Sequence, residues 1–208
     1  MSLRPDNYLW DQLLIAEDAW THACRNVLNK HGYVKIRSQR LMGFCTSVFV
    51  LRKHLLHIRD IETQYTRSSL KESGWKGAVS VRFKIYGVSM CFVGCHLCAH
   101  DHLLPIRIKE YNTIVETHEY SDKDVPKILY HDYIFWMGDL NFRLVENSYD
   151  SNQIVESVEK GEFAKLLAKD QLNQVRREGE AFHELTEKLP NFAPTYKFEV
   201  GTDQYSKK

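Results

Sequence analysis

The feature that most constrains the fold of this sequence is a pair of apolar runs joined at one glycine. From 79 to 85, Val, Val, Phe and Ile alternate with Ser, Arg and Lys, and after Gly87 a second apolar run extends from 88 to 97. Because successive side chains of a strand point to opposite faces, this pattern predicts an antiparallel hairpin with one buried face.

The rest of the chain alternates helical and strand-like patterns. The helical patterns predict helices at 10–28 and at about 103–120, and helical pieces from 153 to 175 that are broken near Gly161 and Asp170. The strand-like patterns predict strands at 48–51 and from Leu55 to Ile61, and a short buried strand at 133–137. The alternation lacks the regular period of a barrel or a doubly wound sheet. We therefore expect a layered α/β fold with mixed or mostly antiparallel sheets.

The amino-acid composition limits the kinds of protein that this chain can be. The chain has 208 residues, 43% of them hydrophobic, which favours one domain over 1–208. Twenty-eight basic and 27 acidic residues give a net charge of +1, so strong general attraction to nucleic acid is not expected. The five cysteines are scattered, and no run approaches the roughly 18 apolar residues of a membrane span. These features predict a cytoplasmic protein.

The candidate catalytic residues follow the apolar run 134–137, in the segment Gly138, Asp139, Leu140 and Asn141. In an extended strand Asp139 and Asn141 point to the same side. A carboxylate can orient or deprotonate water, an amide can donate to a phosphoryl oxygen, and Gly138 leaves room for a phosphate. The alternative is a plain turn, because Gly-Asp-x-Asn is ordinary turn chemistry.

The string F-W-M-G-D-L-N-F-R at 135–143 resembles the signature of the inositol polyphosphate 5-phosphatases, within the endonuclease/exonuclease/phosphatase superfamily. Further segments resemble blocks of the same family in the same order, at 75–79, 92–100, 170–173 and 192–205. The run 125–143 is most similar to the skeletal-muscle and kidney-enriched subgroup.

The resemblance implies a four-layer α/β sandwich of the DNase-I type, with two packed mixed sheets flanked by helices. It implies that water attacks, in line and with Mg²⁺ as cofactor, the 5-position phosphate of a phosphoinositide or inositol polyphosphate, for example phosphatidylinositol 4,5-bisphosphate. It also implies peripheral membrane contact and no nucleic-acid partner. By the same resemblance, Asp139 orients the water, Asn141 binds the scissile phosphate and His96 donates to a phosphoryl oxygen. The substrate-binding residues that it implies are Lys76, Arg143, Tyr196 and Lys197.

The chain departs from the family pattern at several points. Family segments ending in a metal-proximal Asn and in a magnesium-binding Glu have no counterpart before 10–20, so no metal ligand is assigned. A basic block and an Asp-His pair expected after 208 are also missing, and Trp75 and Gly94 stand where the family usually has Asn. We expect the chain alone to be weakly active or inactive, with unpaired sheet edges prone to association.

Two alternatives for the function of the chain, and two for individual residues, stay open at this point. The chain could be a catalytically incomplete fragment that acts as a binding module, or a nuclease of the same superfamily. His96 on an apolar strand could be a buried structural histidine. The Cys and His residues at 91, 95, 96, 98, 100 and 102 could form a zinc site, although their spacing does not fit a zinc finger.

Overall fold

The computed structural model describes residues 19–41, 43–68 and 76–206, and these form two compact units. The first unit comprises the described residues up to Cys98 together with Lys109–Leu140, and the second comprises Ala99–Ile108 and the described residues from Asn141. A single domain over 1–208 stays a prediction.

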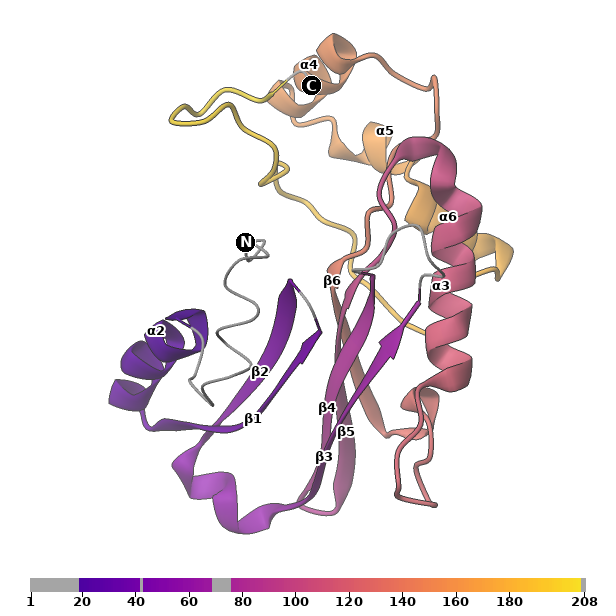
Figure 1. Cartoon of the computed structure of the whole chain (residues 1–208). Coiled ribbons are helices and arrows are strands. Elements are labelled where there is room, and N and C mark those ends of the chain that lie inside the picture. Colours follow the sequence, from indigo (N-terminus) through magenta and orange to yellow (C-terminus); the bar gives the residue numbers. More distant parts are fainter. Residues whose placement is uncertain (1–18, 42, 69–75, 207–208) are drawn as a thin grey trace. The chain divides into compact units, whose positions relative to one another are not determined.

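Helices and strands of the first unit alternate as the sequence patterns predict (Figure 1). Its strands are β1 (Tyr33–Leu41), β2 (Phe44–Leu51), β3 (Ile58–Arg67), β4 (Gly77–Ile85), β5 (Val88–His96) and β6 (Tyr133–Asp139). Its helical elements are α2 (Ala19–Leu28), the 3₁₀ helices η1 (Asn29–His31), η2 (Arg52–His57) and η4 (Ile128–Tyr130), and most of α3 (Leu104–Thr117).

The strands form two sheets. β1 and β2 pair as an antiparallel ribbon, and the second sheet has the order β3-β4-β5-β6. In that sheet β3, β4 and β5 are antiparallel while β5 and β6 are parallel, so the sheet is mixed, as predicted. The predicted hairpin is confirmed: β4 and β5 pair from Ile85 with Val88 to Gly77 with His96.

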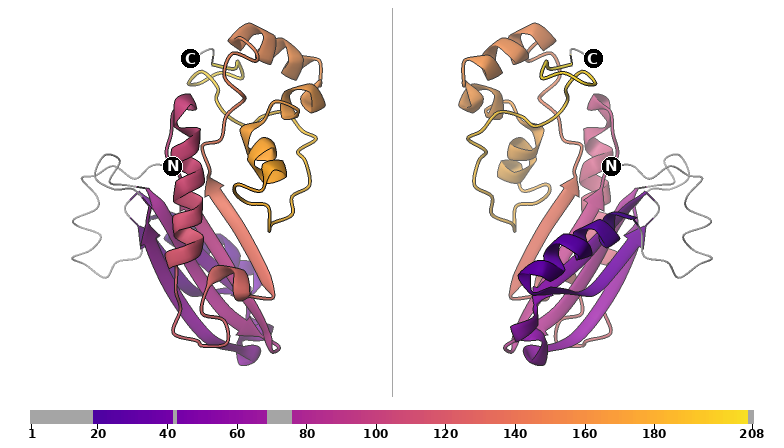
Figure 2. Two further views of the ribbon diagram at one scale, coloured as in Figure 1. Left: turned by 90° about the vertical axis from the view of Figure 1, so that its right-hand side faces the viewer. Right: turned by 90° about the vertical axis from the view of Figure 1, so that its left-hand side faces the viewer.

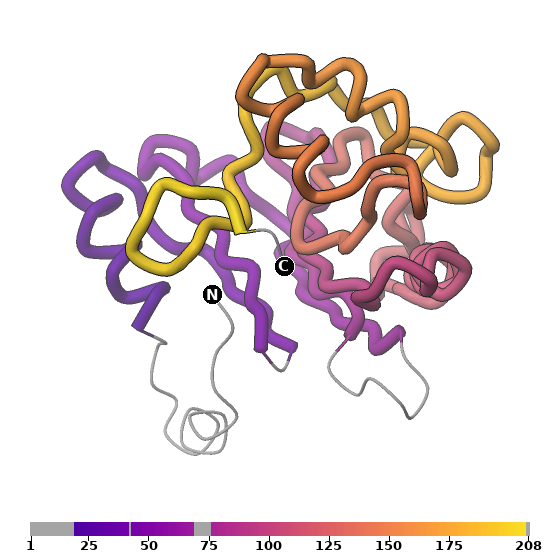
Figure 3. The backbone as a smooth tube through the Cα atoms, turned by 90° about the horizontal axis from the view of Figure 1, so that it is seen from above, coloured from indigo at the N-terminus to yellow at the C-terminus, as the bar shows by residue number. Residues whose placement is uncertain are grey.

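The first unit has four layers, in the order α2, β1–β2, β3–β6 and α3. In Figure 2, α3 lies in front of the strands in one view and α2 lies in front of them in the opposite view, so the two helices cover opposite outer faces. Seen from above, the tube of Figure 3 shows the indigo-to-purple residues of β1–β2 beside the magenta residues of the other sheet. The described part of the chain therefore has the predicted α/β sandwich.

The core between the sheets is built by Val48, Ile58, Val81 and Phe83, which are all buried. Burying an apolar side chain of this size contributes roughly 1.5–3 kcal/mol, so these contacts hold β2 against β3 and β4.

The prediction that the hairpin has only one buried face was wrong. Ser80 and Arg82, on the other face of β4, are 0% and 1% exposed. Segments that follow α3 cover this face, and they supply the hydrogen bonds that burial requires: Ser80 Oγ bonds His118 Nε2 at 2.7 Å, and Arg82 donates to Asp122 at 3.0 Å.

The strand predicted at 133–137 forms, but the prediction that it is buried was wrong. Tyr133, Phe135 and Met137 are 59%, 43% and 46% exposed. These three side chains share one face of β6, because side chains alternate along a strand. The β1–β2 ribbon packs against β3, β4 and β5, and so does not shield this face of β6.

Other sequence predictions are met in part. The run from Leu55 to Ile61 is divided between η2 and the start of β3, because Leu55 and Leu56 lie in the 3₁₀ helix. The helix predicted at 10–28 is confirmed over Ala19–Leu28, while 10–18 lie outside the described residues. The helix predicted at about 103–120 ends at Thr117. Within the described ranges, no helix is both long and apolar enough to cross a bilayer.

The second unit contains short helices joined by irregular chain. They are η3 (Asp101–Leu103), the start of α3, α4 (Ser151–Glu159), α5 (Phe163–Leu167) and α6 (Gln171–Glu178). The predicted breaks near Gly161 and Asp170 are confirmed. Asp150 forms a capping box with Gln153 at the start of α4, and the Asp170 side chain accepts from the Asn173 amide at the start of α6.

Candidate active site

The parallel strands β5 and β6 end together, with His96 paired to Asp139. Because parallel strands carry their carboxyl ends to the same edge of a sheet, the two side chains lie close together: His96 Nε2 is 3.6 Å from Asp139 Oδ2. Their side chains are 33% and 64% exposed. The preceding residue, Cys95, is 2% exposed, as expected where successive side chains of a strand face opposite sides. The imidazole and the carboxylate are thus both open to solvent.

Lys76 completes this group from the residue just before β4. Its ammonium donates a hydrogen bond to His96 Nε2. An ammonium has donors only, so Nε2 is the acceptor and the ring proton lies on Nδ1. Burial lowers the pKa of His96, the Lys76 charge lowers it further, and Asp139 opposes both. Burial also lowers the pKa of Lys76, again opposed by Asp139. The imidazole is therefore held neutral between a cation and an anion.

Two glycines allow neighbouring strands to approach closely at this edge of the sheet. Gly77 has φ +150°, and a Cβ there would overlap the Thr66 carbonyl oxygen; Gly138 has φ +130°, and a Cβ there would overlap the backbone of Cys95. The sequence analysis assigned Gly138 to close approach of a phosphate. The structure instead shows that it allows close approach of β5, which sets His96 beside Asp139.

The sequence analysis missed two site neighbours that lie on β2. Phe44 directs its ring edge at the His96 ring, with centroids 6.0 Å apart. A Cβ at Gly94 would overlap Thr46 Oγ1, so the Thr46 side chain occupies the space that a side chain at 94 would take. The Thr46 hydroxyl therefore lies beside Gly94, which is two residues before His96 on β5. Gly94 is the position at which the family pattern usually has Asn. No sequence signal links 44 and 46 to 94 and 96, because the residues belong to different sheets.

Asn141 belongs to the second unit and does not continue β6. The strand ends at Asp139, and Asn141 has φ +56°. The prediction that both side chains project from one extended strand was therefore wrong. Arg143 donates from Nη2 to Asn141 Oδ1 at 3.1 Å and lies 3.9 Å from an oxygen of Asp101. The two residues predicted to bind phosphate thus form one polar group within the second unit.

Tyr196 and Lys197 lie in the irregular C-terminal segment of the second unit. Both are exposed, Tyr196 by 79%. The segment is closed by Ser206, which donates from its amide to the Lys197 carbonyl at 2.9 Å, and by stacking of Phe198 on Tyr205. The structure places the site residues in two groups: His96, Asp139 and Lys76 in the first unit, and Asn141, Arg143, Tyr196 and Lys197 in the second.

Metal-binding capacity is limited in the part of the chain that the structure describes. No three His, Cys, Asp or Glu side chains come together there as a metal site requires. Burial raises the pKa of Cys91 and of Cys95 to about 12, so both thiols stay protonated and behave as small buried hydrophobes. The described residues therefore do not fit a zinc site, and they do not by themselves hold a magnesium ion.

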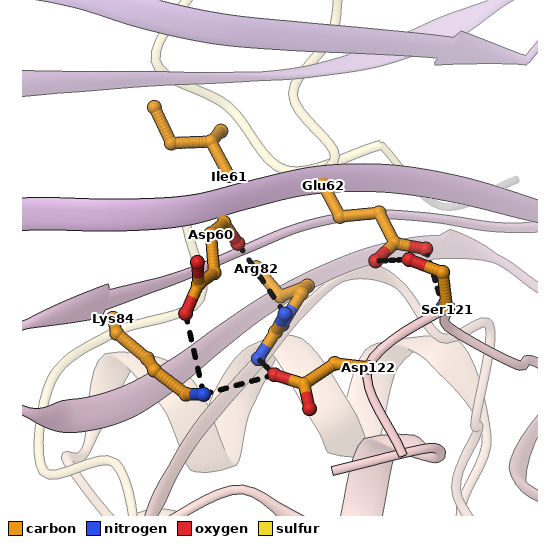
Figure 4. Close-up of a pocket in the computed structure, with 7 residues that line it drawn as sticks. All are labelled: Asp60, Ile61, Glu62, Arg82, Lys84, Ser121 and Asp122. Atoms are coloured by element: carbon orange, nitrogen blue, oxygen red, sulfur yellow. Dashed lines mark hydrogen bonds and ion pairs between the residues drawn. The ribbon is translucent and has the colours of Figure 1, made fainter. Parts of the chain in front are cut away.

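A polar cavity of about 440 Å³ lies elsewhere in the first unit, along the opposite half of β4 (Figure 4). Its cations are already paired: Lys84 Nζ lies 3.3 Å from Asp60 and 3.0 Å from Asp122, which also accepts from the buried Arg82. The two cations hold the pKa of Asp122 well below its usual range, as does the Asp124 amide. The ion pairs that line this cavity hold the segment after α3 against the sheet. We assign no reaction to the cavity.

Comparisons with known proteins identify a family and two kinds of structural relative. Residues 3–208 match Endonuclease/Exonuclease/phosphatase family 2. Human phosphatidylinositol 4,5-bisphosphate 5-phosphatase A is 35% identical over 90% of the chain, which spans 19% of that protein. The 5-phosphatase domain of SPsynaptojanin, crystallised with inositol (1,4)-bisphosphate and a calcium ion, superposes with a TM-score of 0.84 at 31% identity, covering 94% of this chain and 59% of that one. A Cimex nitrophorin, crystallised as its ferrous NO complex, superposes with a TM-score of 0.71 at 27% identity, covering 90% of this chain and 63% of that one.

Proposed function

The chain belongs to Endonuclease/Exonuclease/phosphatase family 2, and from this membership we propose that it hydrolyses the 5-position phosphate of phosphoinositides or inositol polyphosphates. The observation that carries the proposal is the juxtaposition of His96, Asp139 and Lys76 at one edge of the sheet. The relatives named for phosphoinositide and inositol phosphate 5-phosphatase activity support it.

The three residues divide the work of phosphoester hydrolysis. The Asp139 carboxylate orients the attacking water and accepts its proton. Lys76 moves from His96 Nε2 to a phosphoryl oxygen; Nε2 then takes a proton from water while Nδ1 releases its own proton to water, and the Nε2 N–H donates to the same phosphoryl group. Both contacts strengthen as charge builds on the phosphoryl oxygens, so they favour the transition state over the ground state.

Asn141, Arg143, Tyr196 and Lys197 are proposed to bind the phosphates of the substrate. Arg143 presents a planar fork that suits phosphate, and it already holds the Asn141 side chain in place. Tyr196 and Lys197 are exposed and supply a hydroxyl and an ammonium for a second ring phosphate. The family resemblance implies that this is the phosphate at the neighbouring position of the inositol ring.

We propose Mg²⁺ as the cofactor. Mg²⁺ is commonly held by one or two carboxylates together with substrate phosphates and water, and it offsets charge on a leaving oxygen. The described residues do not complete such a site, so its remaining ligands lie outside them. We further propose a cytoplasmic protein with peripheral membrane contact; its five cysteines, which form no disulfide, support this location.

The test is metal-dependent phosphate release from phosphatidylinositol 4,5-bisphosphate. It uses the chain itself and a chimaera in which the chain replaces the matching residues of the SPsynaptojanin 5-phosphatase domain. Asp139→Asn should lower kcat at least about 100-fold, as loss of one transition-state group commonly does. Asp124→Asn, at an exposed carboxylate outside the site, should have no effect.

Two results would refute the proposal. One is a folded chimaera without activity under conditions in which the parent domain turns over. The other is an Asp139→Asn chimaera with full activity. The nitrophorin shows that this fold also occurs in a protein crystallised as a ferrous NO complex, so the test depends on turnover and not on folding.

A further inference from the structure

The end of the first unit opposite His96 carries an exposed surface that is both basic and apolar. We define the η2 surface as Arg52, Lys53, Leu55, Leu56, Arg59 and Tyr86. Leu56 is 79% exposed and Tyr86 is 58% exposed, while Leu55 is 36% exposed. Arg52, Lys53 and Arg59 are also exposed, and residues 51–59 contain no acidic residue. Large apolar side chains grouped with cations in this way are typical of a contact surface.

The cations of the η2 surface are not neutralised locally. Within the described ranges, Arg52, Lys53 and Arg59 make no ion pair, and the nearby Asp60 carboxylate is already paired with Lys84 at 3.3 Å. The surface therefore presents three positive charges next to two leucines.

Tyr86 is held rigidly on this surface. The His57 ring stacks on it with centroids 4.3 Å apart, and its hydroxyl bonds His54 Nδ1 at 2.8 Å. Its φ of +52° lies in the left-handed region, at a turn position that normally takes Asn, Asp or Gly. Such a conformation is strained for a residue with a side chain and persists where the surroundings or a function favour it. A fixed, exposed aromatic ring is the kind of anchor that binding surfaces use.

We propose that the η2 surface binds an acidic, leucine- or phenylalanine-containing segment of a partner protein. Glu or Asp side chains would meet Arg52, Lys53 and Arg59, and apolar side chains would cover Leu55, Leu56 and Tyr86. The charge of the surface excludes a basic partner, and its exposed leucines distinguish it from a purely ionic contact.

An anionic bilayer has the same charge, but the position of the surface disfavours it. β4 runs from Gly77, paired with His96, to Ile85, next to Tyr86, which is about 26 Å at roughly 3.3 Å per residue. If the catalytic edge faces a membrane lipid, as the proposed function requires, the η2 surface lies at the other end of the strands and faces away. This step alone rests on the proposed function.

The experiment measures binding of a short fluorescein-labelled peptide, in which pairs of Glu are separated by Leu or Phe, to the full chain by fluorescence anisotropy. A peptide with Lys in place of each Glu is the matched probe. We expect the acidic peptide to bind at least about tenfold more tightly than the basic one, a difference of about 1.4 kcal/mol. Its affinity should fall as salt is raised, because exposed charges are screened.

Substitutions on the η2 surface test which residues contact the acidic peptide. Arg52→Glu with Lys53→Glu, and separately Leu56→Ser, should each weaken acidic-peptide binding about tenfold or more. Lys109→Glu with Lys123→Glu makes the same change of charge at exposed sites outside the surface and should leave most of the binding intact. Asp139→Asn should bind the peptide normally, which separates this proposal from the catalytic one.

Three outcomes overturn the proposal. The first is equal binding of the acidic and basic peptides, and the second is acidic-peptide binding that the η2 variants do not change. In the third, the chain binds no peptide but binds, through Arg52 and Lys53, phosphatidylcholine vesicles that contain phosphatidylserine. The last outcome would assign the surface to a membrane. The comparison of the two peptides uses the unmodified chain, so the proposal stays testable if a variant does not fold.

Discussion

Lys76 donates a hydrogen bond to His96 Nε2 at the point where β4 and β5 end side by side. The pair joins two residues 20 positions apart into one charge arrangement with Asp139. It fixes the tautomer of the imidazole and keeps the ring neutral, and both properties can be measured without substrate.

Lys76→Met should raise the pKa of His96. The Lys76 charge disfavours the imidazolium, so its removal leaves burial opposed by Asp139 alone. Titration of the imidazole by NMR measures the pKa, and the ring nitrogen shifts report the tautomer. Lys109→Met, at an exposed lysine on α3, should leave the titration unchanged. An unshifted His96 pKa in Lys76→Met would show that the contact does not control the ring.

Lys197→Ala should reduce turnover of phosphatidylinositol 4,5-bisphosphate in the chimaera. A hydrogen bond to a charged group contributes about 1.5–3 kcal/mol, which corresponds to a loss of about 10- to 100-fold in kcat/KM. Phosphatidylinositol 5-phosphate lacks the neighbouring phosphate, so its turnover should change far less. Lys188→Ala, in the same exposed segment, is the control. Equal losses on both substrates would remove Lys197 from the second phosphate site.

Gly94→Ala should destabilise the first unit by about 1–3 kcal/mol, because its methyl group would overlap Thr46 Oγ1. Thr46→Ala removes that atom, so the double variant should recover at least about 1 kcal/mol relative to the sum of the single variants. Urea unfolding of the four proteins gives the coupling energy. Additive losses would place the Thr46 side chain away from Gly94.

Acid should destabilise the chain through His118. Burial lowers the pKa of His118 to about 4, and the ring bonds Thr66 Oγ1 and Ser80 Oγ. The unfolded chain protonates this histidine at its higher, ordinary pKa. Stability is therefore complete above that value and falls by about 1.4 kcal/mol per pH unit as the pH drops toward about 4.

Urea unfolding between pH 7.5 and pH 4.5 measures this slope, to which His131 adds in the same direction because burial also lowers its pKa. His118→Gln should reduce the slope, whereas His183→Gln, at an exposed histidine, should not. The same slope in wild type and His118→Gln would contradict a neutral buried His118.

Asp122→Asn should destabilise the first unit, because it removes the carboxylate that Arg82 and Lys84 share. Arg82 is 1% exposed and would keep a buried charge without its anion. Thermal unfolding should show a clear fall in Tm for Asp122→Asn and almost none for Asp124→Asn, at the neighbouring exposed carboxylate. Equal Tm values would show that the cluster does not stabilise the sheet.

Local pattern predicted much of what the structure shows. Alternation around Gly87 predicted the β4–β5 hairpin, and the apolar run 134–137 predicted the strand β6. The subgroup within the family and the localisation stay predictions.

Local pattern could not predict what depends on residues far apart in the chain. Burial of Ser80 and Arg82 depends on partners 38 to 49 residues away, and exposure of Phe135 depends on the width of the opposite sheet. The sequence by itself determined the β4–β5 hairpin and the strand β6, and it placed an imidazole and a carboxylate at strand ends. Only the tertiary structure decided that β5 and β6 are parallel neighbours and that Lys76, Phe44 and Thr46 surround the site. The physical reason is that strand periodicity is encoded by neighbours in the chain, whereas strand pairing and sheet packing depend on contacts between distant segments.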